Sequence, residues 1–114
     1  MPALPVSIRL LREIASRSDH NSYLHVAVVT RGGVLLSVEC NQSSHHAECR
    51  ALEKLWPSER KGTTVYSLRF TMGHKKLTMA RPCSECEAYM RRYGVKKVVY
   101  SSTGGELLSW RLRD

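Results

Sequence analysis

The chain has 114 residues, of which 42% are hydrophobic and 25% are charged, and its formal net charge is +8. This length and composition are those of one folded globular domain and exclude a largely disordered chain. We also expect neither a membrane-spanning helix of ~20 apolar residues nor a signal peptide, because no apolar run is suitable for either. We therefore expect a single domain over residues 1–114 in the cytoplasm, with no membrane partner and with its four cysteines as thiols or metal ligands.

The spacing of apolar residues predicts helices and strands that alternate along the chain. In chain order, it predicts a helix at residues 5–16, strands at 23–30 and 34–40, a helix at 45–56, a strand at 64–70, a helix at 83–93, and strands at 95–100 and 106–110. Gly32 and Gly33 lie between two β-branched runs and indicate a hairpin. Ser43 or Ser44 can cap the second helix, which Pro57 should end.

The connections between these segments predict the topology of the sheet. The strands at 34–40, 64–70 and 95–100 follow one another through helices, so we expect them to be parallel neighbours with right-handed crossovers. Residues 101–105 are too few for such a crossover, so the last strand must turn back antiparallel. The predicted fold class is α/β, with a mixed five-stranded sheet, an antiparallel C-terminal hairpin, and the starts of the second and third helices open to the same side.

Two short motifs at the starts of these two helices carry the candidate chemistry. His46 offers an imidazole nitrogen, and Cys83 and Cys86 offer two thiolates, a donor set suited to Zn²⁺ at about 2.0 to 2.3 Å. Three protein ligands leave tetrahedral zinc one open position for water, whose pKa falls to about 7 in catalytic zinc sites. Glu48 is two residues past His46, where it can take the proton of that water as a general acid/base.

The motifs His46-Ala47-Glu48 and Pro82-Cys83-Ser84-Glu85-Cys86, in this order of elements, resemble the cytidine deaminase-like superfamily over nearly the whole chain. The resemblance implies a three-layer α/β/α fold and hydrolytic removal of an exocyclic amine from a nucleobase. In that family, activated water attacks the ring carbon that bears the amine, and the glutamate moves the proton to the ring nitrogen and then to ammonia. These roles carry over to His46, Cys83, Cys86 and Glu48.

Other residues resemble different branches of the superfamily. The histidine ligand and the run at 94–100 look like deoxycytidylate and tRNA adenosine deaminases, whereas the predicted final hairpin looks like cytidine deaminases and deaminase toxins. Asn41 resembles the asparagine that contacts the sugar or base in many relatives. We also assign substrate contacts to Ala47, and to Tyr23 and His25 near the first strand.

The positive charge is concentrated in residues 58–114, which hold twelve Lys/Arg against five Asp/Glu. This asymmetry indicates either an anionic partner or a solvated basic face. Lys75, Lys76 and Arg81 flank the loop before the cysteines and favour an anionic group near the site. Because only eight residues are aromatic, an extended nucleic-acid channel is disfavoured. We therefore expect a zinc-dependent deaminase that acts on cytidine, deoxycytidine or a monophosphate of either. We also expect the protein to form a homo-oligomer.

Two alternatives remain open at this level. One is a deaminase acting on cytosine or adenine in single-stranded DNA or RNA, of the editing or toxin type, and the other is a catalytically silent zinc-binding domain. Cys49 could close the zinc site as a fourth ligand, but that arrangement has no use for Glu48. We therefore interpret Cys49 as a small buried hydrophobe. We interpret Cys40 in the same way, and Trp56 and Trp110 as packing residues.

Overall fold

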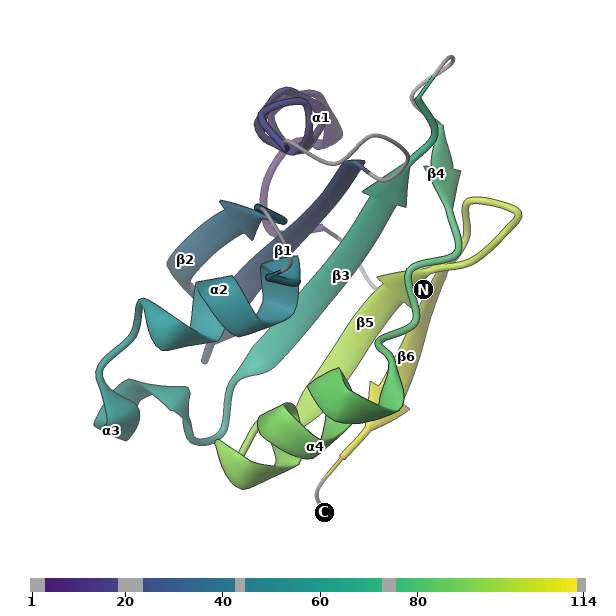
Figure 1. Ribbon diagram of the computed structural model, residues 1–114. Helices are drawn as coiled ribbons and strands as arrows, with labels where there is room; N and C mark the ends of the chain where they lie inside the picture. Colours follow the sequence, from purple (N-terminus) through teal and green to yellow (C-terminus); the bar gives the residue numbers. More distant parts are fainter. Residues whose placement is uncertain (1–3, 19–23, 43–44, 73–75, 113–114) are drawn as a thin grey trace.

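The computed structural model describes residues 4–18, 24–42, 45–72 and 76–112 (Figure 1). The helices are α1 Ile8–Ala15, α2 Ala47–Glu53, α3 Pro57–Arg60 and α4 Ser84–Arg92. The strands are β1 Leu24–Arg31, β2 Val34–Cys40, β3 Thr64–Phe70, β4 Leu77–Thr78, β5 Lys97–Ser101 and β6 Leu107–Arg111. Every predicted helix and strand is therefore present, with ends that differ by at most three residues.

The strands form one mixed sheet in the order β2-β1-β3-β5-β6, and β4 pairs with β3 outside this path. The β3–β5 pair is parallel, and the β1–β2, β1–β3 and β5–β6 pairs are antiparallel. Helix α1 covers one face of the sheet, whereas α2 and α4 lie on the other (Figure 1). The three-layer α/β/α fold and the antiparallel C-terminal hairpin are thus confirmed.

Two features of the sheet differ from the prediction. Strands β2 and β3 do run in the same direction, but they are not neighbours, because β1 lies between them and is antiparallel to both. Strand β1 is buried at all but its last residue, whereas β2 begins with two exposed residues, as expected for an interior strand and an edge strand. The sixth strand, β4, lies in the segment before the cysteines, which we expected to be a loop.

The predicted hairpin between β1 and β2 is present, and its turn depends on two glycines. Gly32 and Gly33 have φ angles of 58° and 81°, a region that side chains with a Cβ atom rarely adopt. Two consecutive positive φ angles are those of a type I′ turn, whose twist matches that of the two strands. The glycine pair therefore explains why the chain reverses here.

Helix α2 is shorter than predicted. It begins at Ala47, with His46 in an extended conformation at the N-cap position (φ −72°, ψ 149°). The expected caps, Ser43 and Ser44, lie outside the described residues. Pro57 does not end this helix but begins α3, because the first helical position needs no N–H donor and suits the fixed φ of proline.

Each face of the sheet has its own hydrophobic core. On the face of α1, Leu11 and Ala15 pack against Val26, Val28 and Leu68. On the face of α2 and α4, helix residues such as Ala51, Leu52 and Met90 pack against the alternate residues of the strands, among them Ala27, Val29, Val65 and Val98. The side chains of β1 and β3 that follow this second alternation toward the start of α2 are His25 and Ser67.

Candidate metal centre

The three predicted metal ligands come from the starts of α2 and α4. His46 is the residue just before α2, and Cys83 is the residue just before α4, while Cys86 lies in the first turn of α4. Both helices lie on the same face of the sheet, so their starts converge although the two motifs are 37 residues apart. Cys83 and Cys86 therefore lie at the start of α4, where the dipole of the helix is positive.

The geometry of these three side chains fits a metal ion. Their ligand atoms all lie within 4.8 Å of one another. Nδ1 of His46 is 3.8 Å from Sγ of Cys83 and 2.9 Å from Sγ of Cys86. Tetrahedral zinc would hold a nitrogen and a sulfur ligand about 3.6 Å apart, so a modest shift of Cys86 completes the site. The imidazole and two thiolates also match the chemical preference of zinc.

The protonation of Cys86 is tied to its neighbour Cys49. Sγ of Cys49 lies 4.0 Å from Sγ of Cys86. The hydrogen bond with Cys49 and the burial of the side chain both raise the pKa of the Cys86 thiol above its usual range. A thiol in this setting needs a cation to become a stable thiolate, which zinc coordination supplies.

Cys49 itself departs from the prediction in one respect. Its side chain is half-buried rather than buried, and it lines a cavity of about 220 Å³ beside the metal group. It is not a member of the three-residue group whose ligand atoms converge. Cys40, by contrast, is only 4% exposed, as predicted.

Glu48 is buried next to this group. It is the second residue of α2, and only 1% of its surface is exposed. Its Oε1 atom has no hydrogen-bond partner among the described residues, although Nε2 of His25 lies 3.4 Å away. A buried carboxylate oxygen without a partner is costly, so this atom is suited to receive a proton or a hydrogen bond from a bound water or substrate.

His25 contacts both Glu48 and β3. Its Nε2 atom lies 2.7 Å from Oγ of Ser67, and the Ser67 hydroxyl donates a hydrogen bond of 2.8 Å to the carbonyl oxygen of Ala80. Burial lowers the pKa of His25 more than the nearby Glu48 carboxylate raises it, and the positive charge of Arg69 lowers it further. The imidazole is therefore neutral near pH 7.

The other predicted substrate contacts are placed as follows. Asn41 is buried, and its Oδ1 accepts a hydrogen bond of 3.2 Å from the backbone N–H of His25. Ala47 is fully buried in the core under α2. Tyr23 lies outside the described residues. The role of these residues in binding substrate stays a prediction.

Sequence reasoning missed Ser67 and Arg69 on β3. Both lie on the same face of the strand as Val65, and Arg69 is the direct cross-strand partner of His25. The available signal was a serine and an arginine at alternate positions of an otherwise apolar strand. That signal acquires meaning only when β3 is known to pair with β1.

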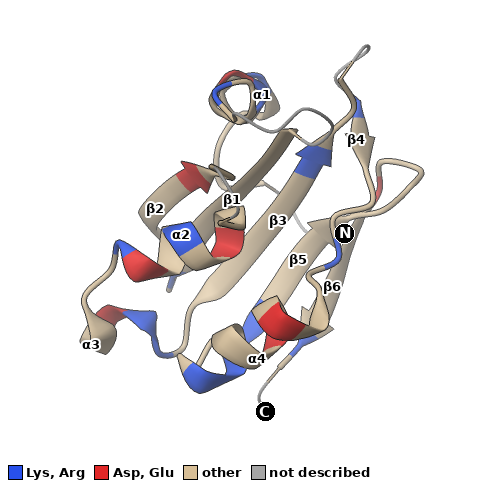
Figure 2. Cartoon of the chain, in the orientation of Figure 1, with Lys and Arg blue, Asp and Glu red and all other residues tan. Residues whose placement is uncertain are grey.

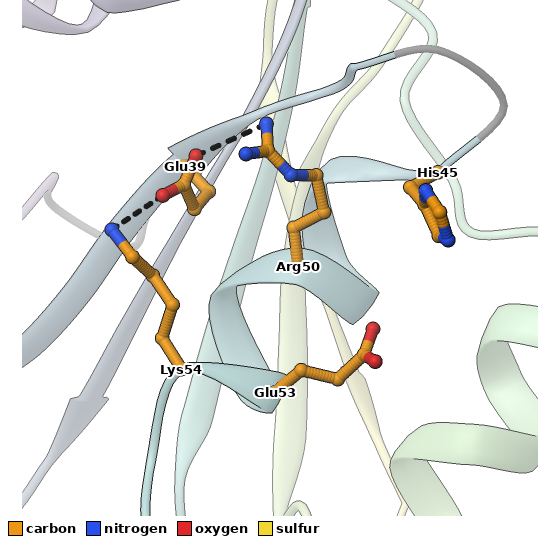
Figure 3. Close-up of a pocket in the computed structure, with 5 residues that line it drawn as sticks. All are labelled: Glu39, His45, Arg50, Glu53 and Lys54. Atoms are coloured by element: carbon orange, nitrogen blue, oxygen red, sulfur yellow. Dashed lines mark ion pairs between the residues drawn. The ribbon is translucent and has the colours of Figure 1, made fainter.

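A second cavity, of about 300 Å³, lies beside α2 and shares His45 and Glu53 with the first (Figure 3). Its charges are largely paired, because Glu39 forms ion pairs with Arg50, at 3.2 Å, and with Lys54. These contacts tie α2 to β2. The ion pairs around this cavity therefore hold α2 against β2, and none of the residues that line it belongs to the metal group.

The basic residues of the second half of the chain are distributed over several elements (Figure 2). Arg91 and Arg92 end α4, where they complement its dipole. The guanidinium of Arg81 lies over the ring of Trp110, 4.3 Å from its centroid, so Trp110 is a packing residue as predicted. The same prediction is wrong for Trp56, which is 76% exposed. Lys75 lies outside the described residues.

Fold and site together define a zinc-binding domain of the cytidine deaminase-like class. The chain belongs to the family described as the cytidine and deoxycytidylate deaminase zinc-binding region, whose match spans residues 7–102. The predicted zinc cofactor is thereby confirmed at the level of the family and of a His/Cys/Cys group able to hold it.

Solved structures with the same fold include RibD from Acinetobacter baumannii in two forms. They match with TM-scores of 0.58 and 0.57 and 20% sequence identity, over 82% of this chain. The chain spans about a quarter of their length, since the match covers 26% of each. No curated protein matches the sequence. Among the described helices, none is long and apolar enough to cross a membrane.

Proposed function

We propose that this domain is a zinc-dependent deaminase that hydrolyses a cytosine-type base to the uracil-type base and ammonia. The observation that carries the proposal is the position of Glu48. Its buried carboxylate, with one oxygen lacking a hydrogen bond among the described residues, lies two residues from His46 of the metal group. A closed structural zinc site would have no use for such a group.

In this proposal His46, Cys83 and Cys86 hold the zinc ion. When bound, zinc lowers the pKa of a coordinated water to about 7 and so makes it a nucleophile near neutral pH. Glu48 accepts a proton from the attacking water and delivers it to the ring nitrogen beside the reacting carbon. It then moves a second proton to the departing amine, so that one water is consumed and one ammonia leaves.

The preferred substrate is a free cytidine, a deoxycytidine or a monophosphate of either. Lys76 and Arg81 flank the segment that leads into Cys83, and both are exposed. They could balance the charge of a single phosphate. The basic residues of the second half are spread over α3, α4, β3, β5 and β6. A single strand of nucleic acid needs a continuous basic groove, which this distribution does not favour.

A base in single-stranded DNA or RNA is the second candidate substrate. It is favoured by two exposed aromatic side chains, Trp56 and Tyr89, because bases can stack on such rings. The guanidinium of Arg92 lies 5.6 Å from the centroid of Tyr89, which adds a positive charge at that surface. Stacking with an adjacent cation is typical of single-strand binding.

The decisive experiment measures ammonia release by the zinc-loaded protein on a panel of substrates. The panel contains cytidine, deoxycytidine, their monophosphates, adenosine, and single-stranded DNA and RNA oligonucleotides at low and moderate salt. We expect turnover of a free cytidine-type substrate, and none with Glu48→Gln as control. Turnover of oligonucleotides alone, suppressed by moderate salt, would replace the preferred substrate by the second one. No ammonia from any substrate would favour a catalytically silent zinc domain.

A further inference from the structure

We propose that His25 is a positioning residue for the proposed deaminase reaction, on which this inference rests. Its Nε2–H group directs the carboxylate of Glu48 toward the metal centre. His25 belongs to β1, and Glu48 belongs to α2, so the contact joins the sheet to the helix that begins at the metal group. Nε2 of His25 and Oε1 of Glu48 are 3.4 Å apart, and both side chains are buried.

The hydrogen bonds of Ser67 show which ring nitrogen of His25 carries the hydrogen. A serine hydroxyl has one hydrogen, and that of Ser67 is donated to the carbonyl oxygen of Ala80 at 2.8 Å. Oγ of Ser67 must therefore accept from Nε2 of His25, 2.7 Å away. This hydrogen is donated to Ser67, and the same nitrogen lies 3.4 Å from Oε1 of Glu48, which has no hydrogen-bond partner among the described residues. The nitrogen near the carboxylate therefore carries a hydrogen rather than a lone pair.

The histidine is held at its backbone and at its ring. The backbone N–H of His25 donates to Oδ1 of Asn41 at 3.2 Å, and the backbone N–H of Asn41 donates back to the carbonyl of His25 at 3.1 Å. The ring is held through Ser67 and Ala80, and the N–H of Ala80 donates to the carbonyl of Ser101 at 2.9 Å. The imidazole is therefore linked to β3 through Ser67, and through Ala80 and Ser101 to β5.

This chain of contacts also reaches the metal ligands. Ala80 is three residues before Cys83, so the carbonyl that orients Ser67 belongs to the segment that places this ligand. Glu48, in turn, is two residues past His46. The position of the Glu48 carboxylate relative to the metal group thus depends on two links: its own helix next to His46, and the contacts of His25 with the segment before Cys83.

A neutral N–H group suits this task. Burial keeps the imidazole uncharged near pH 7, so it orients the carboxylate without competing for the proton that Glu48 must move. The separation of 3.4 Å is longer than the 2.7 to 3.2 Å of a typical hydrogen bond. Catalytic hydrogen bonds are often long in the free protein and shorten in the complex with substrate.

The test compares two substitutions of His25 in the full chain. The side-chain amide of glutamine can place an N–H donor where Nε2 lies, whereas leucine of similar size cannot. We expect His25→Leu to lower kcat roughly 10- to 100-fold, the range found when groups that orient site residues are removed. KM and zinc content should change little, and His25→Gln should recover most of the loss. Val29→Ala, buried on the same face of β1, is the control for general destabilisation.

A second measurement does not depend on turnover. Nitrogen NMR of histidine-labelled protein reports the tautomer of His25 and the shift of its Nε2-bound hydrogen. We expect the Nε2–H tautomer, and a clear shift of this signal in Glu48→Gln. An unchanged signal in Glu48→Gln, or the Nδ1–H tautomer, overturns the proposal even if no substrate is turned over or His25→Leu fails to fold.

The two proposals fail in different ways. If the wild-type protein turned over none of the substrates, the proposed deaminase function would be wrong. The NMR measurement would still show whether His25 contacts Glu48. Turnover by the wild type with kcat unchanged in His25→Leu would retain the deaminase and overturn the positioning role. Equal losses in His25→Leu and His25→Gln, matched by Val29→Ala, would also overturn it, since they indicate packing alone.

Discussion

The metal centre has two sides that are built in different ways. The metal side consists of His46, Cys83 and Cys86, all within one turn of a helix start, and two of the three are exposed. The second side, to which we assign the proposed proton transfer and which we call the proton side, consists of the buried residues Glu48 and His25. The first side is made of local motifs, whereas the second depends on the pairing of strands. The metal side should therefore tolerate changes in the sheet that the proton side does not.

The largest expected effect is the loss of a metal ligand. Cys86→Ser should lose zinc and all turnover, because the buried Cys86 sulfur completes the three-ligand group. Cys49→Ser is the matched control, since its sulfur lies only 4.0 Å from that of Cys86 but outside the group. Zinc content and the visible spectrum of the cobalt form measure both. If Cys49→Ser lost the metal as completely as Cys86→Ser, the open three-ligand site would be wrong.

The next effect separates the two sides of the centre. Glu48→Gln should lower kcat by about 10²- to 10⁴-fold, the contribution of a positioned general acid/base. Zinc content and the unfolding midpoint should stay close to those of the wild type, because glutamine has nearly the same shape and Glu48 is outside the metal group. Ammonia release and metal analysis on one preparation test this. Undiminished turnover would contradict the assigned role of Glu48.

A third effect concerns stability on the proton side. The pKa of His25 in the folded protein is lowered by burial, so below the unfolded value of about 6.5 the unfolded chain binds a proton that the folded one does not. The stability contributed by neutral His25 is therefore present above this pH and is lost as the pH falls. We would measure the free energy of unfolding in urea at pH 7.5 and at pH 5.5, with the same zinc content. Between these two pH values it should fall more for the wild type than for His25→Gln. Equal losses would contradict the buried neutral histidine.

The smallest effect lies outside both sides. Arg81→Ala removes the guanidinium over Trp110, a contact worth about 0.5–1 kcal/mol when exposed. We expect a stability loss of that order and an unchanged kcat on a nucleoside, because Arg81 contacts the rings of β5 and β6 rather than the metal group. Denaturant unfolding and steady-state kinetics measure these quantities. A large fall in kcat would mean that the Arg81 segment also controls the position of Cys83.

The sequence alone determined the metal side and most of the elements. A histidine and a cysteine just before two helices, with Cys86 in the next turn, form local patterns whose geometry follows from helix start signals and the periodicity of an α-helix. The final hairpin was equally determined, because residues 101–105 are too short for a parallel crossover.

Only the tertiary structure decided the strand order and the proton side. The hairpin of β1 and β2 could have met β3 with either strand, and in the fold it is β1 that pairs with β3 and is buried. That choice places His25 opposite Arg69 and beside Ser67, a partner 42 residues away in the chain. The spacing of apolar residues predicts which face a side chain occupies, but it does not specify which strand lies next to it. Contacts between neighbouring strands follow from their packing and register, and so they become visible only in the folded sheet.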